Sequence, residues 1–118
     1  MIQDDDYARA KETLIAHGTA IGALPPLGAD KEWAALRHFV EDLGARGWTR
    51  NDVHDLTQDV LSHESERMSA NAFNMLFDFI ETLGYDCTPA NIVRFPGDPE
   101  DEWELVLYAR SRVGLQEG

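Results

Sequence analysis

Residues 69–83 read SANAFNMLFDFIETL and contain the longest strongly apolar stretch of the chain. Aromatic and aliphatic side chains cover most of the circumference of a helix built on this segment. Only a narrow polar stripe interrupts them, formed by Asn74, Asp78, Glu81 and Thr82. A helix that is apolar nearly all round is usually buried in a fold. We therefore expect a helix from Ser69 to Leu83, ended by Gly84, with the other helices packed around it.

Three amphipathic segments precede this central segment. The first spans about residues 4–17 and has three aspartates in its first turn, where the helix dipole favours negative charge. The second is expected to begin with Asp30 as its N-cap and to end just before Gly44. The third begins near Thr49, whose spacing to Asp52 resembles a capping box.

Glycines and prolines separate the first two of these segments. Gly18, Gly22 and Gly28 flank the Pro25-Pro26 pair. Proline lacks a backbone donor and restricts the residue before it, so helices rarely run through such a pair. We expect the glycines to be loop formers.

The sequence pattern changes after Gly84. Residues 91–95 (NIVRF) and 103–109 (WELVLYA) are short, β-branched or aromatic runs that are typical of strands, and a turn-rich segment, 96–102, separates them. That loop is longer than the roughly two to five residues favoured in hairpins, but a hairpin is still the expected structure. The predicted fold class is α+β: a single compact domain over residues 1–118, with about four helices followed by a C-terminal β-hairpin. Residues 1–6 and 113–118 are expected to be frayed termini.

The chain is strongly acidic. Its 118 residues carry 22 Asp and Glu against 10 Lys and Arg, a formal net charge of −12, yet 43% of them are hydrophobic. That apolar content argues against a wholly disordered chain. The charge argues against direct binding to nucleic acid or anionic membranes, which both require a basic footprint. The N-terminus has no secretory signal pattern and Cys87 is the only cysteine, so we expect a cytoplasmic protein.

No motif of catalysis or cofactor binding is present. Nucleophile-elbow, phosphate-loop and dinucleotide-binding patterns are missing, and the histidines lack the spacing of a zinc site. We therefore predict no catalytic residue, no metal and no cofactor. His38 and Asp42 are expected to form a surface pair on one helix. A metal-dependent or acid–base enzyme that uses His54 and Asp55, with His38 or His63, is the weakest hypothesis.

The acidic residues gather in three clusters. The first is Asp4–Asp6, the second follows the polar side of the third helix, and the third lies in the expected hairpin loop. Like charges at helical spacing destabilise a helix by a few tenths of a kcal/mol per pair, so such a stripe suggests a role in binding. Capping and plain solvation are the alternative explanation. The candidate partner-binding residues are Asp52, Asp55, Asp59, Glu66, Asp98, Glu100, Asp101, Glu102, Trp103 and Glu104.

These observations favour a small acidic binding or inhibitor protein whose carboxylates dock on a basic protein partner. The best-motivated partner is a nucleic-acid-handling protein, because carboxylates could occupy its phosphate-binding groove. Nuclease inhibitors, immunity proteins and anti-defence proteins work on this physical basis, and the analogy is one of charge and size. The alternative is an interaction or scaffold domain that self-associates through the C-terminal strands or the aromatic helix. A monomer and a homodimer are both compatible with the sequence.

Overall fold

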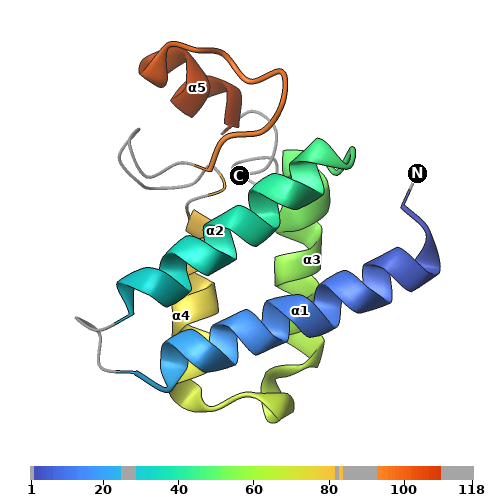
Figure 1. The fold of residues 1–118 in the computed structure, drawn as a ribbon, viewed down its shortest axis with the longest axis vertical. Coiled ribbons are helices and arrows are strands. Elements are labelled where there is room, and N and C mark those ends of the chain that lie inside the picture. Colours follow the sequence, from blue (N-terminus) through green and yellow to red (C-terminus); the bar gives the residue numbers. More distant parts are fainter. Residues whose placement is uncertain (1, 25–28, 82, 84–92, 110–118) are drawn as a thin grey trace.

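The computed structural model describes residues 2–24, 29–81, 83 and 93–109. Within these ranges the elements are, in order, α1 (Asp4–Gly22), α2 (Asp30–Ala45), α3 (Arg50–His63), the short 3₁₀-helix η2 (Ser65–Arg67), α4 (Ala70–Glu81) and α5 (Glu102–Ala109). Figure 1 shows α1 and α2 side by side, with α3 and α4 crossing behind them. We call α1–α4 the bundle. α5 lies at one end of it, apart from the other helices (Figure 1).

α1 is the helix that connects the bundle, because it packs closely against α2, α3 and α4. Its closest approach is to α4. A Cβ atom on Gly18 would lie 2.8 Å from Cγ of Leu76, and one on Gly22 would lie 2.6 Å from the backbone nitrogen of Ala72. The two glycines are therefore not loop formers, as the sequence suggested. They let the backbones of two helices approach, and α1 extends past the expected end at residue 17 to Gly22.

The junction between α2 and α3 follows local sequence signals. The amide of Gly47 donates to the carbonyl of Gly44, and that of Trp48 donates to Leu43, both at 3.0 Å. This Schellman arrangement needs a residue at positive φ, and Gly47 supplies it with φ of 103°. α3 then begins with the predicted capping box, in which the Thr49 side chain accepts from the Asp52 amide and the Asp52 side chain accepts from the Thr49 amide. The expected N-cap of α2 is wrong by one residue, since α2 begins at Asp30 itself.

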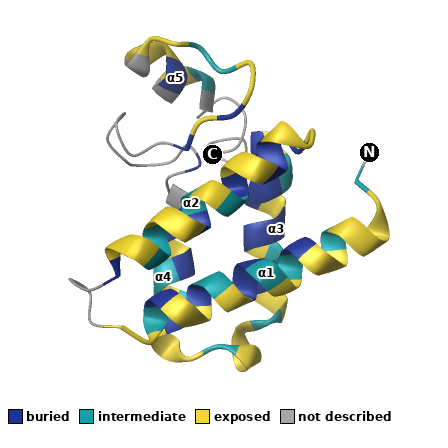
Figure 2. Cartoon of the chain, in the orientation of Figure 1, coloured by how far each residue is buried: buried dark blue, intermediate teal, exposed yellow. Residues whose placement is uncertain are grey.

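α4 starts where the sequence indicated, because the Ser69 hydroxyl accepts a hydrogen bond from the Ala72 amide at 3.1 Å. Leu76 and Phe79 are buried on its inner face, as Figure 2 shows for the facing sides of the bundle helices. α4 is not the centre of the bundle, however. Phe77 is 55% exposed on its outer side, and the helix that packs against all three others is α1.

The predicted α+β class is wrong. Residues 103–109 belong to α5, and no strand occurs in the described ranges, so the described part of the chain is helical. Asp101 explains the error. It lies in the expected loop, but its Oδ1 atom accepts from the amides of Trp103 and Glu104 and so caps a helix over the residues expected to form a strand. Residues 93–95 form no strand, and residues 91–92 lie outside the described part.

Residues 1–6 were expected to be a frayed terminus, and residues 4–6 form the first turn of α1. The expected frayed segment 113–118, and also Cys87, lie outside the described residues. The extent of the single domain stays a prediction.

Candidate functional site

The candidate site is the outward side of α5. Trp103 is 70% exposed and Leu107 is 67% exposed, which makes them the two most exposed large hydrophobic residues in the described ranges. They stand one helical turn apart and so project from the same side of α5. Glu104 follows Trp103 in α5, Glu100 lies three residues before Trp103 in the segment that leads into the helix, and both are exposed. We call Glu100, Trp103, Glu104 and Leu107 the α5 face.

Two features hold the α5 face in its orientation. The Asp101 carboxylate caps the helix, with distances of 2.9 and 3.0 Å from its Oδ1 to the amides of Trp103 and Glu104. On the opposite side, Leu105 is fully buried. A helix of this length is marginally stable alone in water, so α5 depends on tertiary packing. Burial of Leu105 determines which side of α5 faces outward.

A hollow of about 450 Å³ lies next to α5, between its Tyr108 and the beginning of α3. Its aromatic wall consists of Trp48, Phe95 and Tyr108, and Thr49, the N-cap of α3, and Arg50, in its first turn, also line it. Tyr108 follows Glu104 by one turn, so the hollow adjoins the α5 face on one side. The volume is within the range of pockets that accept a side chain or a small ligand.

Asp98 was expected to be a surface charge, but it is a buried partner of Arg50. The Arg50 Nη2 and Asp98 Oδ2 atoms are 2.6 Å apart, and the two side chains are only 3% and 6% exposed. The same carboxylate oxygen accepts the amide of Phe95 at 2.6 Å. Buried ion pairs of this kind serve the structure, because either charge alone would be costly. Asp98 is therefore not available to a partner in this conformation.

The expected acidic stripe on α3 divides into three different environments. Asp52 caps the helix. Asp55 has a side chain that is 68% exposed. Asp59 is held by three neighbours: the Tyr7 hydroxyl donates to its Oδ2 at 2.6 Å, the Lys11 ammonium lies 3.0 Å away, and His63 Nδ1 lies 2.9 Å from its Oδ1.

The contacts of Asp59 change its chemistry. The hydrogen bond from Tyr7, followed by that from Lys11, lowers the pKa of Asp59 to about 2. In return, burial and the hydrogen bond to Asp59 raise the pKa of Tyr7. Asp59 is thus an anion at neutral pH that joins α3 to α1, and Lys11 lies beside it as a counter-charge.

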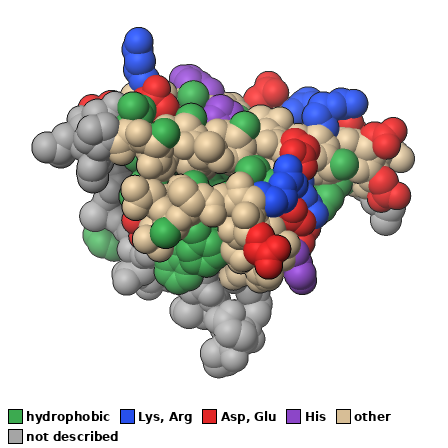
Figure 3. All heavy atoms as spheres, turned by 90° about the horizontal axis from the view of Figure 1, so that it is seen from below, with side chains coloured by type: hydrophobic (Ala, Val, Ile, Leu, Met, Phe, Trp, Pro, Cys, Tyr) green, Lys and Arg blue, Asp and Glu red, His purple; other side chains and the backbone are tan. Residues whose placement is uncertain are grey.

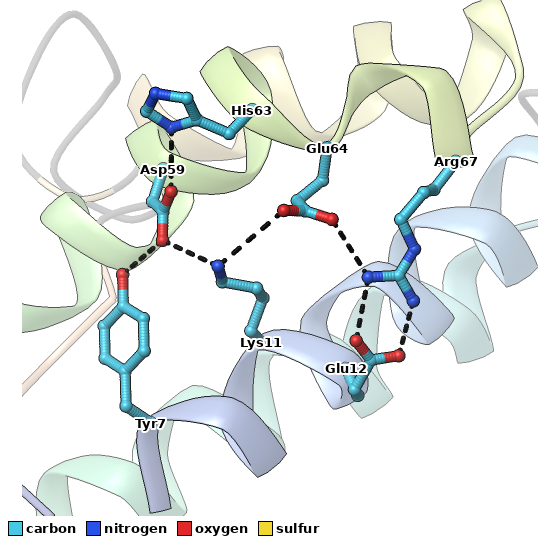
Figure 4. Close-up of polar contacts among 7 residues, drawn as sticks. All are labelled: Tyr7, Lys11, Glu12, Asp59, His63, Glu64 and Arg67. Carbon is cyan, nitrogen blue, oxygen red and sulfur yellow. Dashed lines mark hydrogen bonds and ion pairs between the residues drawn. The ribbon is translucent and has the colours of Figure 1, made fainter. Parts of the chain in front are cut away.

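The same side of the molecule carries a further set of ion pairs (Figure 4). Lys11 also lies 3.8 Å from Glu64, and Arg67 bridges Glu64 at 3.0 Å and Glu12 at 2.5 Å. The guanidinium of Arg67 lowers the pKa of Glu12. These contacts connect α1 to the segment after α3. Figure 3, a view from below, shows acidic and basic side chains next to one another on one part of that face.

The remaining candidate residues are not gathered at one point. Glu66 is exposed on η2, beyond the end of α3. Glu102 lies in the first turn of α5, and its side chain is outside the description. Trp103 and Glu104 are thus exposed on α5 with Glu100 exposed just before it, whereas Asp55 lies on α3 and Glu66 on η2.

The histidines form no metal site in the described ranges, where no group of three potential ligands converges. His54 is buried, with its Nδ1 atom 3.9 Å from Oδ1 of Asp55. His38 pairs with Glu41 at 3.4 Å instead of the expected Asp42, which lies 3.5 Å from Arg46. The enzyme hypothesis gains no support from these positions.

Two residues of the site were missed at the level of sequence. Leu107 was placed in the expected strand 103–109 without a role of its own, although its spacing from Trp103 fits one side of a helix. Arg50 was not singled out at all. Arg50 directly follows the Thr49 cap. A basic residue at that position does not indicate that its partner is Asp98.

Comparisons with protein-family models, with curated proteins and with solved structures found no match to this chain. Across the described residues, no helix has both the length and the apolarity needed to cross a bilayer.

Proposed function

We propose that this protein is a small acidic binding protein that docks on a basic protein partner through the α5 face. The observation that carries the proposal is the exposure of Trp103 and Leu107, at 70% and 67%, beside the carboxylates of Glu100 and Glu104. Large apolar side chains left in water beside charged residues are typical of interaction surfaces.

The two kinds of side chain on the α5 face have different roles in binding. Burial of a tryptophan at an interface commonly contributes about 2 kcal/mol or more, so Trp103 is the expected anchor. The carboxylates of Glu100 and Glu104 lie at its rim, where charges mainly raise the rate of association. The net charge of −12 acts in the same direction, because it attracts a cationic surface from a distance. The partner should thus present Lys or Arg around an apolar contact.

A nucleic-acid-handling partner is the narrower form of this proposal, and its support is the net charge. A long row of free carboxylates would support it further, but Asp52, Asp59 and Asp98 have partners within the chain. The geometry favours a short amphipathic contact over imitation of a phosphate backbone.

Affinity capture from native lysate at low salt, followed by a salt gradient, tests the proposal. The bait is compared with two variants: Trp103→Ala, which removes the anchor, and Phe77→Ala, which removes an exposed aromatic residue from α4. A basic protein should bind the unchanged chain and the Phe77 variant and elute as salt rises. With that protein purified, Trp103→Ala should weaken binding at least about tenfold, which corresponds to roughly 1.4 kcal/mol.

Three results would contradict the proposal. Capture of chaperones alone, or of nothing, would leave no partner. Equal binding by Trp103→Ala would place the contact elsewhere. Binding that is insensitive to salt would remove the electrostatic part of the argument.

Self-association through α4 is the second candidate, and the side chain of Phe77 favours it. Phe77 is 55% exposed and its ring stacks on Phe73, with ring centroids 6.4 Å apart. Light scattering on purified protein distinguishes the two candidates. A stable dimer that Phe77→Ala dissociates would support self-association, whereas a monomer would support the first proposal.

A further inference from the structure

We infer that residues 93–109 form a unit that undocks from the bundle and redocks on it, and that Arg50 is the positioning residue that holds the unit closed. The α5 face belongs to this unit. The part of the inference that concerns affinity for a partner therefore rests on the proposed function.

Arg50 reaches from the first turn of α3 to several points of the C-terminal part of the chain. Its Nη1 atom donates to the carbonyl of Leu83 at 3.0 Å. Its Nη2 atom donates to the carbonyl of Val93 at 2.8 Å and to Asp98 Oδ2 at 2.6 Å. The guanidinium carbon also lies 4.8 Å from the centroid of the Phe95 ring. One side chain thus binds the unit through its backbone, a carboxylate and an aromatic ring.

The contacts of Arg50 also shape the unit itself. The Asp98 carboxylate accepts hydrogen bonds from the Phe95 amide and from the Arg50 guanidinium. The bond from Phe95 closes the turn between residues 95 and 98. Gly97, at φ of 88°, allows that turn. Phe95 then packs against α2 at Gly44, where an added Cβ atom would lie 3.2 Å from the ring. Loss of Arg50 would leave Asp98 buried without a cation and the Phe95 ring without its cover.

The unit contributes Val93 and Phe95 to the buried core, but α5 itself is not among the closely packed helices. Among the described helices, the close contacts run between α1 and α2, α1 and α3, α1 and α4, and α3 and α4. Figure 1 shows the same separation between α5 and the bundle. Segments with few contacts to the main core open locally while the core stays folded.

Undocking would remove the α5 face. α5 has eight residues, and a helix of that length is not stable in water without tertiary packing. Once Leu105 leaves its buried site, Trp103 and Leu107 no longer share one side of a helix. The observed Kd for the partner then equals the intrinsic Kd divided by the docked fraction. Arg50 therefore sets the affinity of a surface that it does not touch.

Hydrogen exchange measured by mass spectrometry on the full chain tests this inference without any partner. We compare Arg50→Met, Arg50→Lys and the control Arg46→Met. Lysine keeps the charge but cannot reproduce the fork of donors. Arg46 is a matched control because its side chain is 53% exposed and it pairs with Asp42 within α2. Exchange within residues 93–109 should accelerate by about 100-fold in Arg50→Met and at least about tenfold in Arg50→Lys.

The bundle supplies the second half of the readout. Amides of α1 and α4 should exchange within about threefold of the unchanged chain in these variants, and Arg46→Met should resemble the unchanged chain throughout. If Arg50→Met unfolds the whole chain, Arg50→Lys decides between the outcomes. Uniform acceleration over all helices, or none in residues 93–109, overturns the inference. Unprotected amides over residues 93–109 in the unchanged chain also overturn it, since a docked unit must be protected.

The exchange result is independent of whether a partner binds. Selective opening without any captured partner would uphold the inference about Arg50 and contradict the proposed function. If a basic partner is known, its Kd should rise in Arg50→Lys by the factor with which the docked fraction falls. An unchanged Kd in a variant whose exchange shows that the docked fraction has fallen to half or less would overturn the consequence for affinity.

Discussion

Replacement of Gly22 by alanine tests whether α1 and α4 meet backbone to backbone. At an exposed helical position Gly→Ala normally stabilises, by about 1 kcal/mol in a helix interior and less at its end. At Gly22 the added Cβ would lie 2.6 Å from the amide nitrogen of Ala72 and 2.7 Å from its Cα atom. Neither atom can rotate away, so the helices must separate.

The magnitude follows from these two opposing effects. Forcing an extra carbon into a packed core typically destabilises by about 1–3 kcal/mol. After subtraction of the gain in helix propensity, Gly22→Ala should lower the free energy of unfolding by about 1–2 kcal/mol. For a chain of this length that corresponds to a decrease in Tm of about 4–8 °C.

Thermal and urea unfolding, followed by circular dichroism, provide the measurement. Gly18→Ala should destabilise as well, because its Cβ would lie 2.8 Å from Cγ of Leu76, a fully buried side chain with little room to move. Thr19→Ala, at an exposed position of the same helix, is the control for propensity alone. If Gly22→Ala were as stable as the unchanged chain, or more stable, the close approach of the two helices would be refuted.

Two further predictions concern single carboxylates. Because Tyr7 and Lys11 lower the pKa of Asp59 to about 2, its contacts stabilise the fold fully above the unfolded pKa of about 4 and lose that contribution as the pH falls toward 2. The difference in urea midpoint between the unchanged chain and Asp59→Asn should therefore shrink over this interval, and a difference that stays constant down to about pH 2 would contradict the assignment. Asp101→Ala should destabilise α5 by about 1 kcal/mol through loss of its cap, whereas Asp101→Asn should retain most of the protection. Amide exchange in residues 102–109 measures both variants, and equal protection in the two would count against the cap.

The sequence predicts those parts of the fold that depend on neighbouring residues. The Thr49 capping box and the Ser69 cap each involve a side chain and an amide three residues away, so their signals lie within one helical turn. Helix ends that depend on tertiary contacts are harder to predict from the sequence. Gly18 and Gly22 resemble a loop until Ala72 and Leu76 are placed beside them.

The C-terminal error has the same origin. Residues 103–109 form a short run of aromatic, aliphatic and β-branched residues that is typical of a strand, and the cap by Asp101 and the burial of Leu105 are features of the helix that forms instead. Asp98 belongs to a run of acidic residues, and composition does not show which of them is buried in an ion pair. Its partner, Arg50, is 48 positions away in the sequence. The sequence therefore indicated an acidic C-terminal surface around Trp103, but not which carboxylates would be free.

The glycine contact between α1 and α4 also has a consequence for the order in which the chain folds during synthesis. When α1 leaves the ribosome, the surfaces available to it are those of α2 and then α3. The face that carries Gly18 and Gly22 stays open until Ala72 and Leu76 have emerged. Closing so long a loop is the slow step that topology imposes. The face of α1 that carries Gly18 and Gly22 therefore stays uncovered until α4 has been synthesised, and α1 completes its packing only after α2, α3 and α4 have all emerged.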